Sequence, residues 1–424
     1  MKRLILVFIF ALVVWQLHAT DSLFFEEHGA IRYDFELVGG NNRIEVVKKQ
    51  VKYLPHQGDN FSQHLQMPDY GSCRYSIFDA DSDTLLFRKG FSPLFKEWQI
   101  TDKANSEIRS YYQALFFPKP KSDVVLKIDE RSFEGSWQTI WIDTIRIDDP
   151  FIINEKYPVG SIDTIMFHGE PGKHVDLVIL AEGYTKNELE KFSLDARRLT
   201  DSLFAAEPFK THKNRFNVLA MQVSSVESGT DIPGEHIYRN TAFNSHFYTF
   251  GSARYLTTSD MKSVYDAIDG VAWDHIYILV NEERYGGGGF YNYLSICTSD
   301  NVQSPFVFCH EFGHAFAGLA DEYYTSSTSY ESFYNLDVEP WEPNITTMMD
   351  FDKKWFSRIN EGTSVPTPRN DEYAGKVGVF EGGGYEAKGI YSPVMSCWMK
   401  EQKAGAFCPV CRDAIEKTIL MHCQ

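Results

Sequence analysis

Residues 306–324, FVFCHEFGHAFAGLADEYY, predict a helix that carries two histidines four positions apart. The Ser-Pro pair at 304–305 marks the start of this helix, because serine caps helices and proline favours the first helical position. Gly318 is the predicted stop, since glycine readily adopts the left-handed conformation found at helix ends. Within the helix, His310 and His314 project from one face, one turn apart.

The histidine pair has the separation that a tetrahedral zinc ion requires of two nitrogen ligands on a rigid backbone. Glu311 follows the first histidine and can reach a metal-bound water without binding the ion itself. We therefore expect one catalytic zinc ion (Zn²⁺), with Glu311 as the general base that later delivers a proton to the leaving amine. By chance alone, the HExxH pattern is expected on the order of a few hundredths of a time in such a chain.

A catalytic zinc ion needs a third protein ligand and one open position. After the glycine stop the chain can reverse and bring Asp321 beneath the ion, so Asp321 is the predicted third ligand. A glutamate from a later segment, Glu331 or Glu339, is the alternative. Glu322 would point the other way and hold a ligand in place from behind.

The chain before this helix alternates apolar strands with a helix. The runs VDLVILAEGY (175–184), RFNVLAMQV (215–223) and DHIYILVN (274–281) are typical of strands buried on both faces. Residues 186–209 have leucine and phenylalanine at helical spacing. This alternation predicts an α/β/α layered domain from about residue 160 onward. The segment has no GxGxxG or P-loop motif, so nucleotide binding is not predicted.

Four consecutive glycines at 286–289 precede the predicted strand YLSIC. They indicate either a flexible surface loop or an edge strand that receives an extended substrate peptide by strand addition. In the second case, Gly288 and Gly289 would form part of the substrate-binding edge.

The N-terminal third of the chain has a different pattern. Short alternating runs such as RYDFELV (32–38) and TIWIDTIRI (139–147) are separated by turn signals, with no long helical period. They predict an antiparallel β-sandwich, which would form an accessory domain at 20–155. The HExxH helix predicts that residues 156–424 form a zincin-like catalytic domain. The expected fold class is therefore multidomain α+β.

The first residues, MKRLILVFIFALVVWQLHA, predict a signal peptide at 1–19 with a charged start and an apolar core. An uncleaved membrane anchor is the alternative, but the apolar run is short for a span. We expect an exported protein, either periplasmic, at the cell surface or secreted, with no transmembrane helix in the mature chain. The net charge of −17 argues against nucleic acid and anionic membranes as partners.

The segment HEFGHAFAGLADEYY (310–324) resembles the zinc-binding segment of the IgA-peptidase family of bacterial metalloendopeptidases and, more distantly, that of the metzincins. Metzincins place a glycine three residues and a third ligand six residues after the second histidine, whereas the offsets here are four and seven. The resemblance continues through GGGYEAKGIYSPVMSCWMK (382–400) and FCPVCRDAI (407–415), and the N-terminal sandwich resembles the family's accessory domain. It implies a secreted zinc metalloendopeptidase that cleaves protein substrates, immunoglobulin A or other glycoproteins among them.

The resemblance also implies a methionine in a tight turn beneath the metal. SCWMK supplies Met399, and Met395 is the competing candidate. The tyrosine that follows this turn in metzincins and steadies the oxyanion is missing here. Tyr323 is our candidate for that role, with Tyr324 or Tyr391 as alternatives.

The chain has seven cysteines, an odd number that leaves at least one without an intramolecular disulfide partner. The C-terminal CPVC motif has two interpretations, disulfide bonds and a structural zinc site. Export favours disulfides there, and a structural zinc site is the alternative. The residues considered for that site are Cys408 and Cys411, with Cys397, Cys423 and His422 nearby.

The sequence is also compatible with two functions other than that of a zinc metalloendopeptidase. The first is a noncatalytic surface or glycan-binding protein with a relic peptidase domain, which would have no need for a general base at Glu311. The second is a metal-dependent hydrolase of a nonpeptide amide, which would need a deep pocket in place of an open groove.

Overall fold

The computed structural model describes residues 23–56, 58, 65, 67–155, 160–324 and 333–423. The predicted signal peptide at 1–19 and the alternative ligand Glu331 lie outside these residues. Among the described helices, none is both long enough and apolar enough to cross a membrane.

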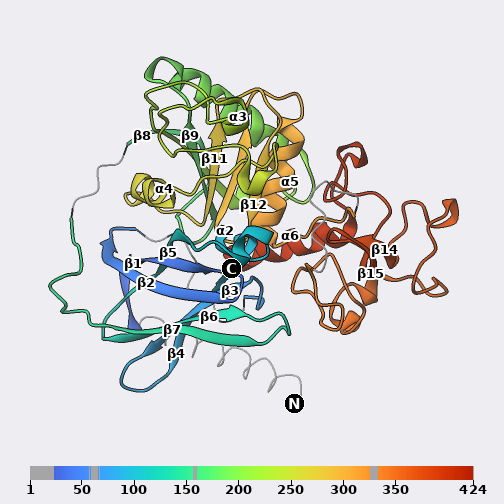
Figure 1. Ribbon diagram of the computed structural model, residues 1–424, viewed down its shortest axis with the longest axis horizontal. Helices are drawn as coiled ribbons and strands as arrows, with labels where there is room; N and C mark the ends of the chain where they lie inside the picture. The colour runs from blue at the N-terminus through green and yellow to red at the C-terminus, as the bar shows by residue number, and fades with distance from the viewer. Residues whose placement is uncertain are drawn as a thin grey trace, which may run out of the picture.

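The N-terminal part consists of two antiparallel sheets, seen below the larger sheet in Figure 1. One sheet has the strand order β2-β1-β5 and the other has the order β4-β3-β6-β7. Buried residues alternate along β5, as expected for a strand with one face on a core. The elements are β1 (Phe25–Gly40), β2 (Arg43–Leu54), β3 (Cys73–Asp79), β4 (Leu85–Phe91), α2 (Leu94–Gln99), β5 (Arg109–Pro120), β6 (Val124–Arg131) and β7 (Trp137–Ile145).

The following part is built on a mixed six-stranded sheet with the order β12-β13-β11-β9-β10-β8. The four central strands are parallel, and the edge strands β12 and β8 run antiparallel to their neighbours. The strands are β8 (Ser161–Met166), β9 (Val175–Glu182), β10 (Phe216–Gln222), β11 (His275–Val280), β12 (Gly287–Phe290) and β13 (Leu294–Thr298). The helices are α3 (Leu189–Ala205), α4 (Met261–Ile268) and α5 (Ser304–Ala317).

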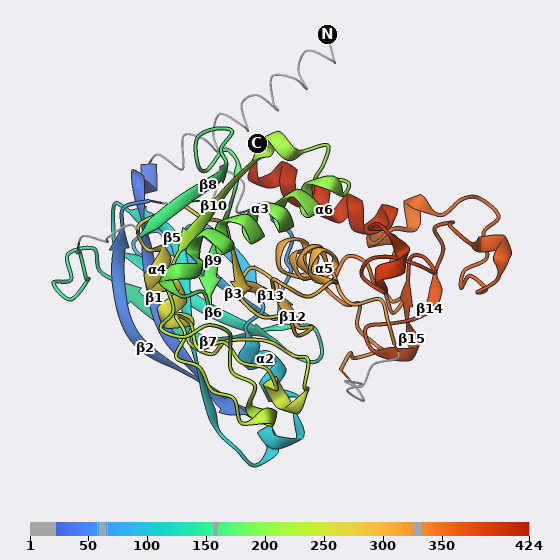
Figure 2. The same cartoon turned by 90° about the horizontal axis from the view of Figure 1, so that it is seen from above.

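Both faces of the central strands are buried, and for this reason their sequences are continuously apolar. Leu177 and Ile179 of β9 belong to a core shared with α3, α5 and the C-terminal helix α6 (Pro409–His422). Figure 2 shows these three helices on one side of the sheet. Val178 and Leu180 belong instead to a core that includes α4 and the N-terminal sheets. The second face is therefore covered by one helix and the N-terminal part of the chain.

A buried ionic cluster also joins these two parts. Arg32 of β1 is fully buried, and its guanidinium lies 2.7 Å from Asp34, 2.7 Å from Asp266 and 2.9 Å from Asp269. The ammonium of Lys52 lies 3.1 Å from the same Asp269 carboxylate. Because Asp266 and Asp269 lie at the C-terminal end of α4, the cluster fixes this helix against β1. A buried cation is tolerated only with such partners.

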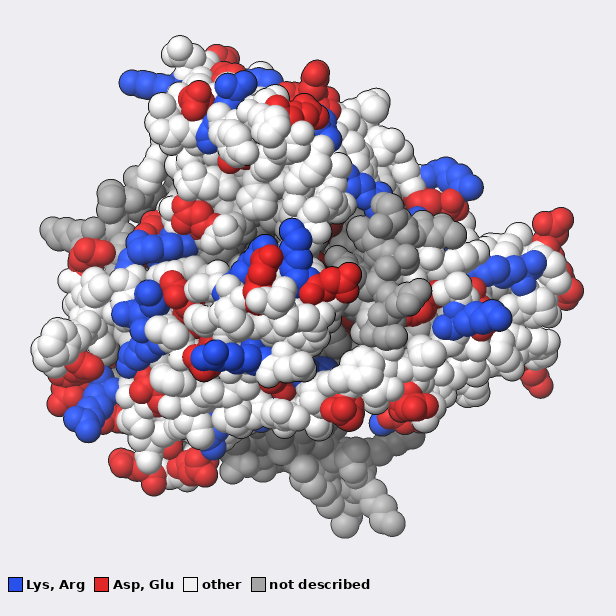
Figure 3. Space-filling view, viewed as in Figure 1, with Lys and Arg blue, Asp and Glu red and all other residues white. Residues whose placement is uncertain are grey.

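The remaining chain forms irregular loops around a small hairpin of β14 (Phe380–Gly383) and β15 (Glu386–Ser392), on the right of Figure 1. Acidic and basic side chains are interspersed over the face shown in Figure 3, where a hollow lies between the three parts of the chain.

Candidate active site

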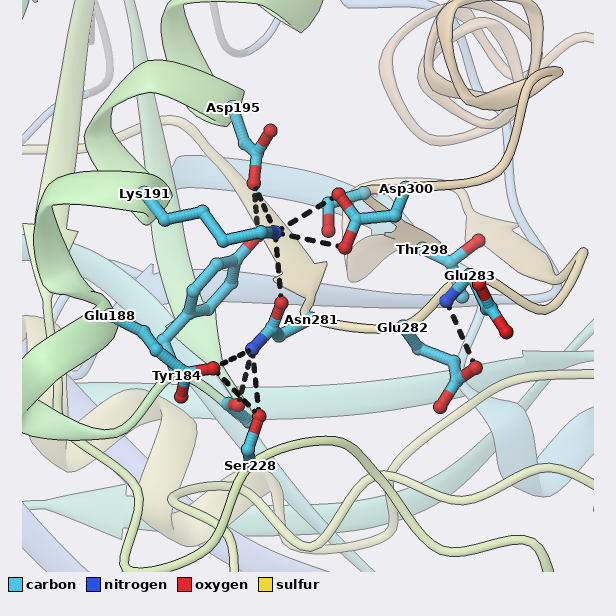
Figure 4. Close-up of polar contacts among 12 residues, drawn as sticks. Tyr184, Glu188, Lys191, Asp195, Ser228, Asn281, Glu282, Glu283, Thr298 and Asp300 are labelled. Atoms are coloured by element: carbon cyan, nitrogen blue, oxygen red, sulfur yellow. Dashed lines mark hydrogen bonds and ion pairs between the residues drawn. The ribbon is translucent and has the colours of Figure 1, made fainter.

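The carboxyl ends of the parallel strands, where open α/β sheets commonly bind ligands, are occupied by an ion-pair network (Figure 4). The ammonium of Lys191 lies 2.7 Å from Asp195 and 2.9 Å from Asp300, and it donates a 2.9 Å hydrogen bond to Asn281. Asn281 follows β11 and Asp300 follows β13, so the Lys191 ammonium links α3 to the carboxyl ends of these strands. The candidate site lies elsewhere, beside α5.

Helix α5 begins one residue away from the expected position. Gln303 is the N-terminal cap, and Ser304 is the first helical residue. The Ser304 hydroxyl does not cap the helix but donates a 2.6 Å hydrogen bond to the Thr298 carbonyl. The helix ends at Gly318, which is left-handed with φ of +64° and donates a backbone hydrogen bond to the His314 carbonyl. The chain then reverses towards the histidines.

The reversal brings Asp321 to both imidazoles. Its Oδ1 atom lies 3.1 Å from Nε2 of His310 and 3.4 Å from Nε2 of His314, and the two Nε2 atoms are 3.1 Å apart. The site is thus formed by three convergent acceptor atoms, one from each residue. Among the described residues, Asp321 Oδ1 is buried without a hydrogen-bond donor. This donor set fits a cation, and two nitrogens and one oxygen suit zinc.

Backbone carbonyls orient the histidines. Nδ1 of His310 lies 2.9 Å from the Trp398 carbonyl, and Nδ1 of His314 lies 2.5 Å from the Leu319 carbonyl. A carbonyl can only accept, so each Nδ1 carries a proton, and Nε2 is the atom that offers its lone pair to a metal once the imidazole is neutral. The hydroxyl of Tyr385 donates a 2.6 Å hydrogen bond to Oδ2 of Asp321.

The electrostatics of the three residues reflect their proximity. Burial lowers the pKa of His314, but Asp321 and Glu311 outweigh this effect and raise it to about 9. Burial raises the pKa of Asp321, yet the two histidines bring it well below its usual range. Burial raises the pKa of Glu311, and the nearby histidines offset this rise only in part. Without a metal, the proximity of the three residues therefore favours the charged forms of both histidines and of Asp321.

The glycines of β12 allow α5 to approach the sheet edge. A Cβ atom on Gly289 would lie 2.3 Å from the carbonyl oxygen of Glu311, and one on Gly287 would lie 2.7 Å from its Oε1 atom. Gly288 and Gly289 line the cleft beside the histidines. The segment at Tyr255 already forms a parallel bridge with Gly287, so the start of this edge strand has a neighbour. Helix packing thus accounts for part of the glycine run.

Met399 lies against the same helix. It is fully buried, and its sulfur is 3.1 Å from where a Cβ atom on Gly313 would lie. The Met399 carbonyl accepts a 2.7 Å hydrogen bond from the Glu322 backbone amide. Met395 is half-buried. The packing beneath α5 therefore comes from Met399.

A cleft of about 1100 Å³ passes over these residues. It is lined by His310, Glu311 and Asp321, and also by Glu97 of α2 in the N-terminal part of the chain. The Tyr255 hydroxyl donates a hydrogen bond to Glu97. Burial raises the pKa of Glu97 to about 7, although this hydrogen bond and His314 act in the opposite direction. The N-terminal part of the chain thus supplies one wall of the cleft.

Glu97 and Tyr385 were not predicted as site residues from the sequence. Glu97 lies in a short helix more than 200 positions before the histidines, with no motif around it. Tyr385 is part of the GGGYEAKG stretch, but nothing in its spacing connects it to Asp321. The proposed oxyanion donor Tyr323 lines the cleft, and its ring lies 5.5 Å from that of Tyr385. Of the alternatives, Tyr324 is 39% exposed.

The other candidate ligands have partners of their own. The carboxylate of Glu339 lies 3.7 Å from the Lys354 ammonium and accepts a hydrogen bond from Thr347. Glu322 points away from the histidines, as expected, but its carboxylate contacts Asn344 and Cys411 and supports neither histidine directly.

The C-terminal cysteines divide into two groups. Cys397, Cys408 and Cys411 converge with Glu322, whereas the Cys423 sulfur contacts the Arg215 carbonyl. The His422 ring lies 3.8 Å from Asp274. All seven cysteines lie among the described residues, and each of them is a free thiol. The disulfides favoured by the sequence are therefore not formed in this structure.

Two family models match the chain. The model described as IgA Peptidase M64 matches residues 164–373 and 369–419, and the model described as Peptidase M64 N-terminus matches residues 22–142. The first match contains the histidine helix, Asp321 and the C-terminal cysteine motif. No curated protein matches the chain.

Proposed function

The chain belongs to the IgA peptidase M64 family of metallopeptidases, and from this premise we propose that it is a zinc-dependent endopeptidase. His310, His314 and Asp321 would hold the ion. The observation that carries the proposal is the convergence of their three ligand atoms, all within 4.8 Å of one another. Bound there, zinc would supply Lewis-acid polarisation of a peptide carbonyl and would acidify a water.

Glu311 is the proposed general base. It lies next to His310 on the same helix, lines the cleft and has a raised pKa, which suits a carboxylate that must accept and then return a proton near neutral pH. In this scheme Glu311 takes a proton from the attacking water and passes it to the amine of the departing peptide. The bond broken is the peptide C–N bond, and the water supplies the new carboxylate oxygen.

Tyr323 is the proposed support for the negative charge that develops on the carbonyl oxygen. Its side chain lines the cleft beside Asp321, and a phenol held there is a neutral hydrogen-bond donor because burial raises its pKa well above the usual value.

The proposed substrate is an extended segment of a protein, including glycoproteins such as immunoglobulin A. The cleft is open and has walls from both parts of the chain, which suits a long peptide better than a small amide. The peptide would pass Gly288 and Gly289 on one side and Glu97 on the other. The signal-like segment at 1–19 supports export, which N-terminal sequencing of the protein recovered outside the cytoplasm would test.

The test combines metal analysis with cleavage of unfolded and native protein substrates. We expect wild-type protein to cleave, chelator to abolish cleavage and added zinc to restore it. Glu311→Gln should keep its zinc, and its rate of peptide cleavage should fall by about 10²–10⁴-fold. Glu361→Gln, a change at an exposed acid of a distant loop, is the matched control. Full activity in Glu311→Gln, or a chain that takes up no metal, would overturn the proposal.

A further inference from the structure

A second group of metal-ligand atoms lies behind the candidate active site. It consists of three thiols and one carboxylate, all from buried residues, and the four ligand atoms lie within 4.8 Å of one another: Glu322, Cys397, Cys408 and Cys411. We propose that these four residues bind a second zinc ion, with a structural role. The binding itself does not depend on the proposed peptidase function.

The separations fit a single tetrahedral ion. The sulfurs of Cys397 and Cys411 are 3.7 Å apart, and Oε1 of Glu322 lies 3.2 Å from Cys411 Sγ and 4.0 Å from Cys408 Sγ. Zinc–sulfur bonds of about 2.3 Å place two thiolates of a tetrahedron about 3.8 Å apart. A disulfide would require about 2.05 Å. The cysteines are therefore spaced as ligands of a common centre.

Backbone amides point at the sulfurs, as a thiolate site requires. Cys397 Sγ accepts hydrogen bonds from the amides of Met399, at 3.4 Å, and Cys408, at 3.3 Å. Cys408 Sγ accepts one from the Cys411 amide at 3.4 Å, and Cys408 is also the N-terminal cap of α6. Such donors favour the charged form of sulfur, which is the form that binds metal.

The carboxylate also calls for a cation. Glu322 is fully buried, and among the described residues its Oε2 atom has no hydrogen-bond partner. Its Oε1 atom accepts a 3.1 Å hydrogen bond from Asn344. The Lys400 ammonium contributes one positive charge to this region but donates its hydrogen bonds to Ser392 and to the Val394 carbonyl. A divalent ion bound between the four side chains would balance the charge of this buried carboxylate together with that of the three thiolates.

The donor set selects the kind of ion. Three sulfurs and one oxygen suit zinc, whereas calcium and magnesium prefer oxygen ligands alone. A disulfide would not satisfy this group as a metal ion does. Only two of the three cysteines could pair, and one thiol would remain beside the carboxylate.

The ion would connect segments that build the active site. Glu322 directly follows Asp321, and Cys397 precedes Trp398, whose carbonyl holds Nδ1 of His310. A metal bridge between Glu322 and Cys397 would therefore fix the third catalytic ligand relative to the first. This positioning role rests on the proposed function.

The test is metal stoichiometry on the full chain. We expect two zinc ions in wild-type protein, one in His310→Ala/His314→Ala and one in Cys408→Ser/Cys411→Ser. Cys423→Ser should retain both ions, because that sulfur lies outside the group. When the histidine variant is reloaded with Co²⁺, it should show thiolate-to-metal charge-transfer absorption in the near ultraviolet.

The Cys408→Ser/Cys411→Ser variant itself is at risk of misfolding, so a measurement on the histidine variant complements it. X-ray absorption at the zinc edge should show sulfur neighbours at about 2.3 Å. One zinc per wild-type chain, unchanged in Cys408→Ser/Cys411→Ser, would refute the second site. A disulfide among the three cysteines, detected by alkylation in denaturant with chelator before and after reduction, would refute it equally. Neither outcome would bear on cleavage by the histidine centre.

Discussion

The hydroxyl of Tyr385 donates a 2.6 Å hydrogen bond to Oδ2 of Asp321, from a position 64 residues later in the chain. The bond leaves Oδ1 as the oxygen that faces the two histidines. Because a bond of this kind fixes the direction of a carboxylate, Tyr385 positions the proposed third ligand although it does not itself bind the ion.

Removing that hydroxyl should therefore weaken metal binding. We expect Tyr385→Phe to lower zinc affinity by about 10–100-fold, measured by competition with a chromophoric chelator. The fold should be retained, because the ring and its contact with Tyr323 stay in place. Tyr324→Phe, a change at a more exposed tyrosine, is the control. Equal affinities in all three proteins would mean that Asp321 is held by other contacts.

The close contact between β12 and α5 predicts a strong effect of a single methyl group. A Cβ atom on Gly289 would lie 2.3 Å from the Glu311 carbonyl oxygen, and backbone cannot move aside as a flexible side chain can. We expect Gly289→Ala to lower the free energy of unfolding by about 1–3 kcal/mol and to impair cleavage.

Denaturant unfolding of Gly289→Ala and Gly160→Ala side by side would check this. A Cβ atom on Gly160 would meet only the side chain of Met221, at 4.0 Å, so that variant should unfold as wild type does. Wild-type stability in Gly289→Ala would show that the helix can shift at little cost.

Metal affinity should depend on pH. The pKa of the His314 imidazole is raised to about 9 without metal, and that of His310 is raised as well. An imidazole must lose its Nε2 proton to bind zinc, so the ion displaces protons and its affinity should fall as the pH falls below about 9. Zinc titrations across this range should show release of about one proton or more per ion at neutral pH. A flat profile would contradict this account.

Asp266, the more exposed carboxylate of the ionic cluster between β1 and α4, predicts a contribution to stability that is lost in acid. Burial raises the pKa of Asp266, but Lys262 and Arg32 outweigh it and lower the value to about 2. A carboxyl with a lowered folded-state pKa stabilises the fold above its unfolded pKa of about 3.8, and this contribution disappears as the pH falls towards 2. Because the side chain is 35% exposed, we expect only about 1 kcal/mol.

Unfolding of Asp266→Asn across about pH 2–5 would measure this contribution. The variant should be less stable than wild type near pH 5 and should approach it near pH 2. Asp81→Asn, a change at an exposed aspartate, should leave the curve unchanged. A constant difference between Asp266→Asn and wild type at every pH would indicate a cause other than charge.

The N-terminal alternation of apolar residues predicted antiparallel strands, and two antiparallel sheets are found there. It did not reveal that Val178 and Leu180 of the central sheet share a core with these strands. Alternation reports which face of a strand is buried, whereas the surface that covers it lies elsewhere in the chain.

Local rules were enough for the centre of the candidate site. The four-residue spacing of His310 and His314 places both on one helical face, and the left-handed glycine at 318 turns the chain back, because both effects act within a few residues. The pairing of Tyr385 with Asp321, the position of Glu97 in the cleft wall and the meeting of Glu322 with three cysteines depend on segments far apart in sequence. No periodicity encodes such contacts, because they arise only when whole sheets and helices pack against one another in the folded chain.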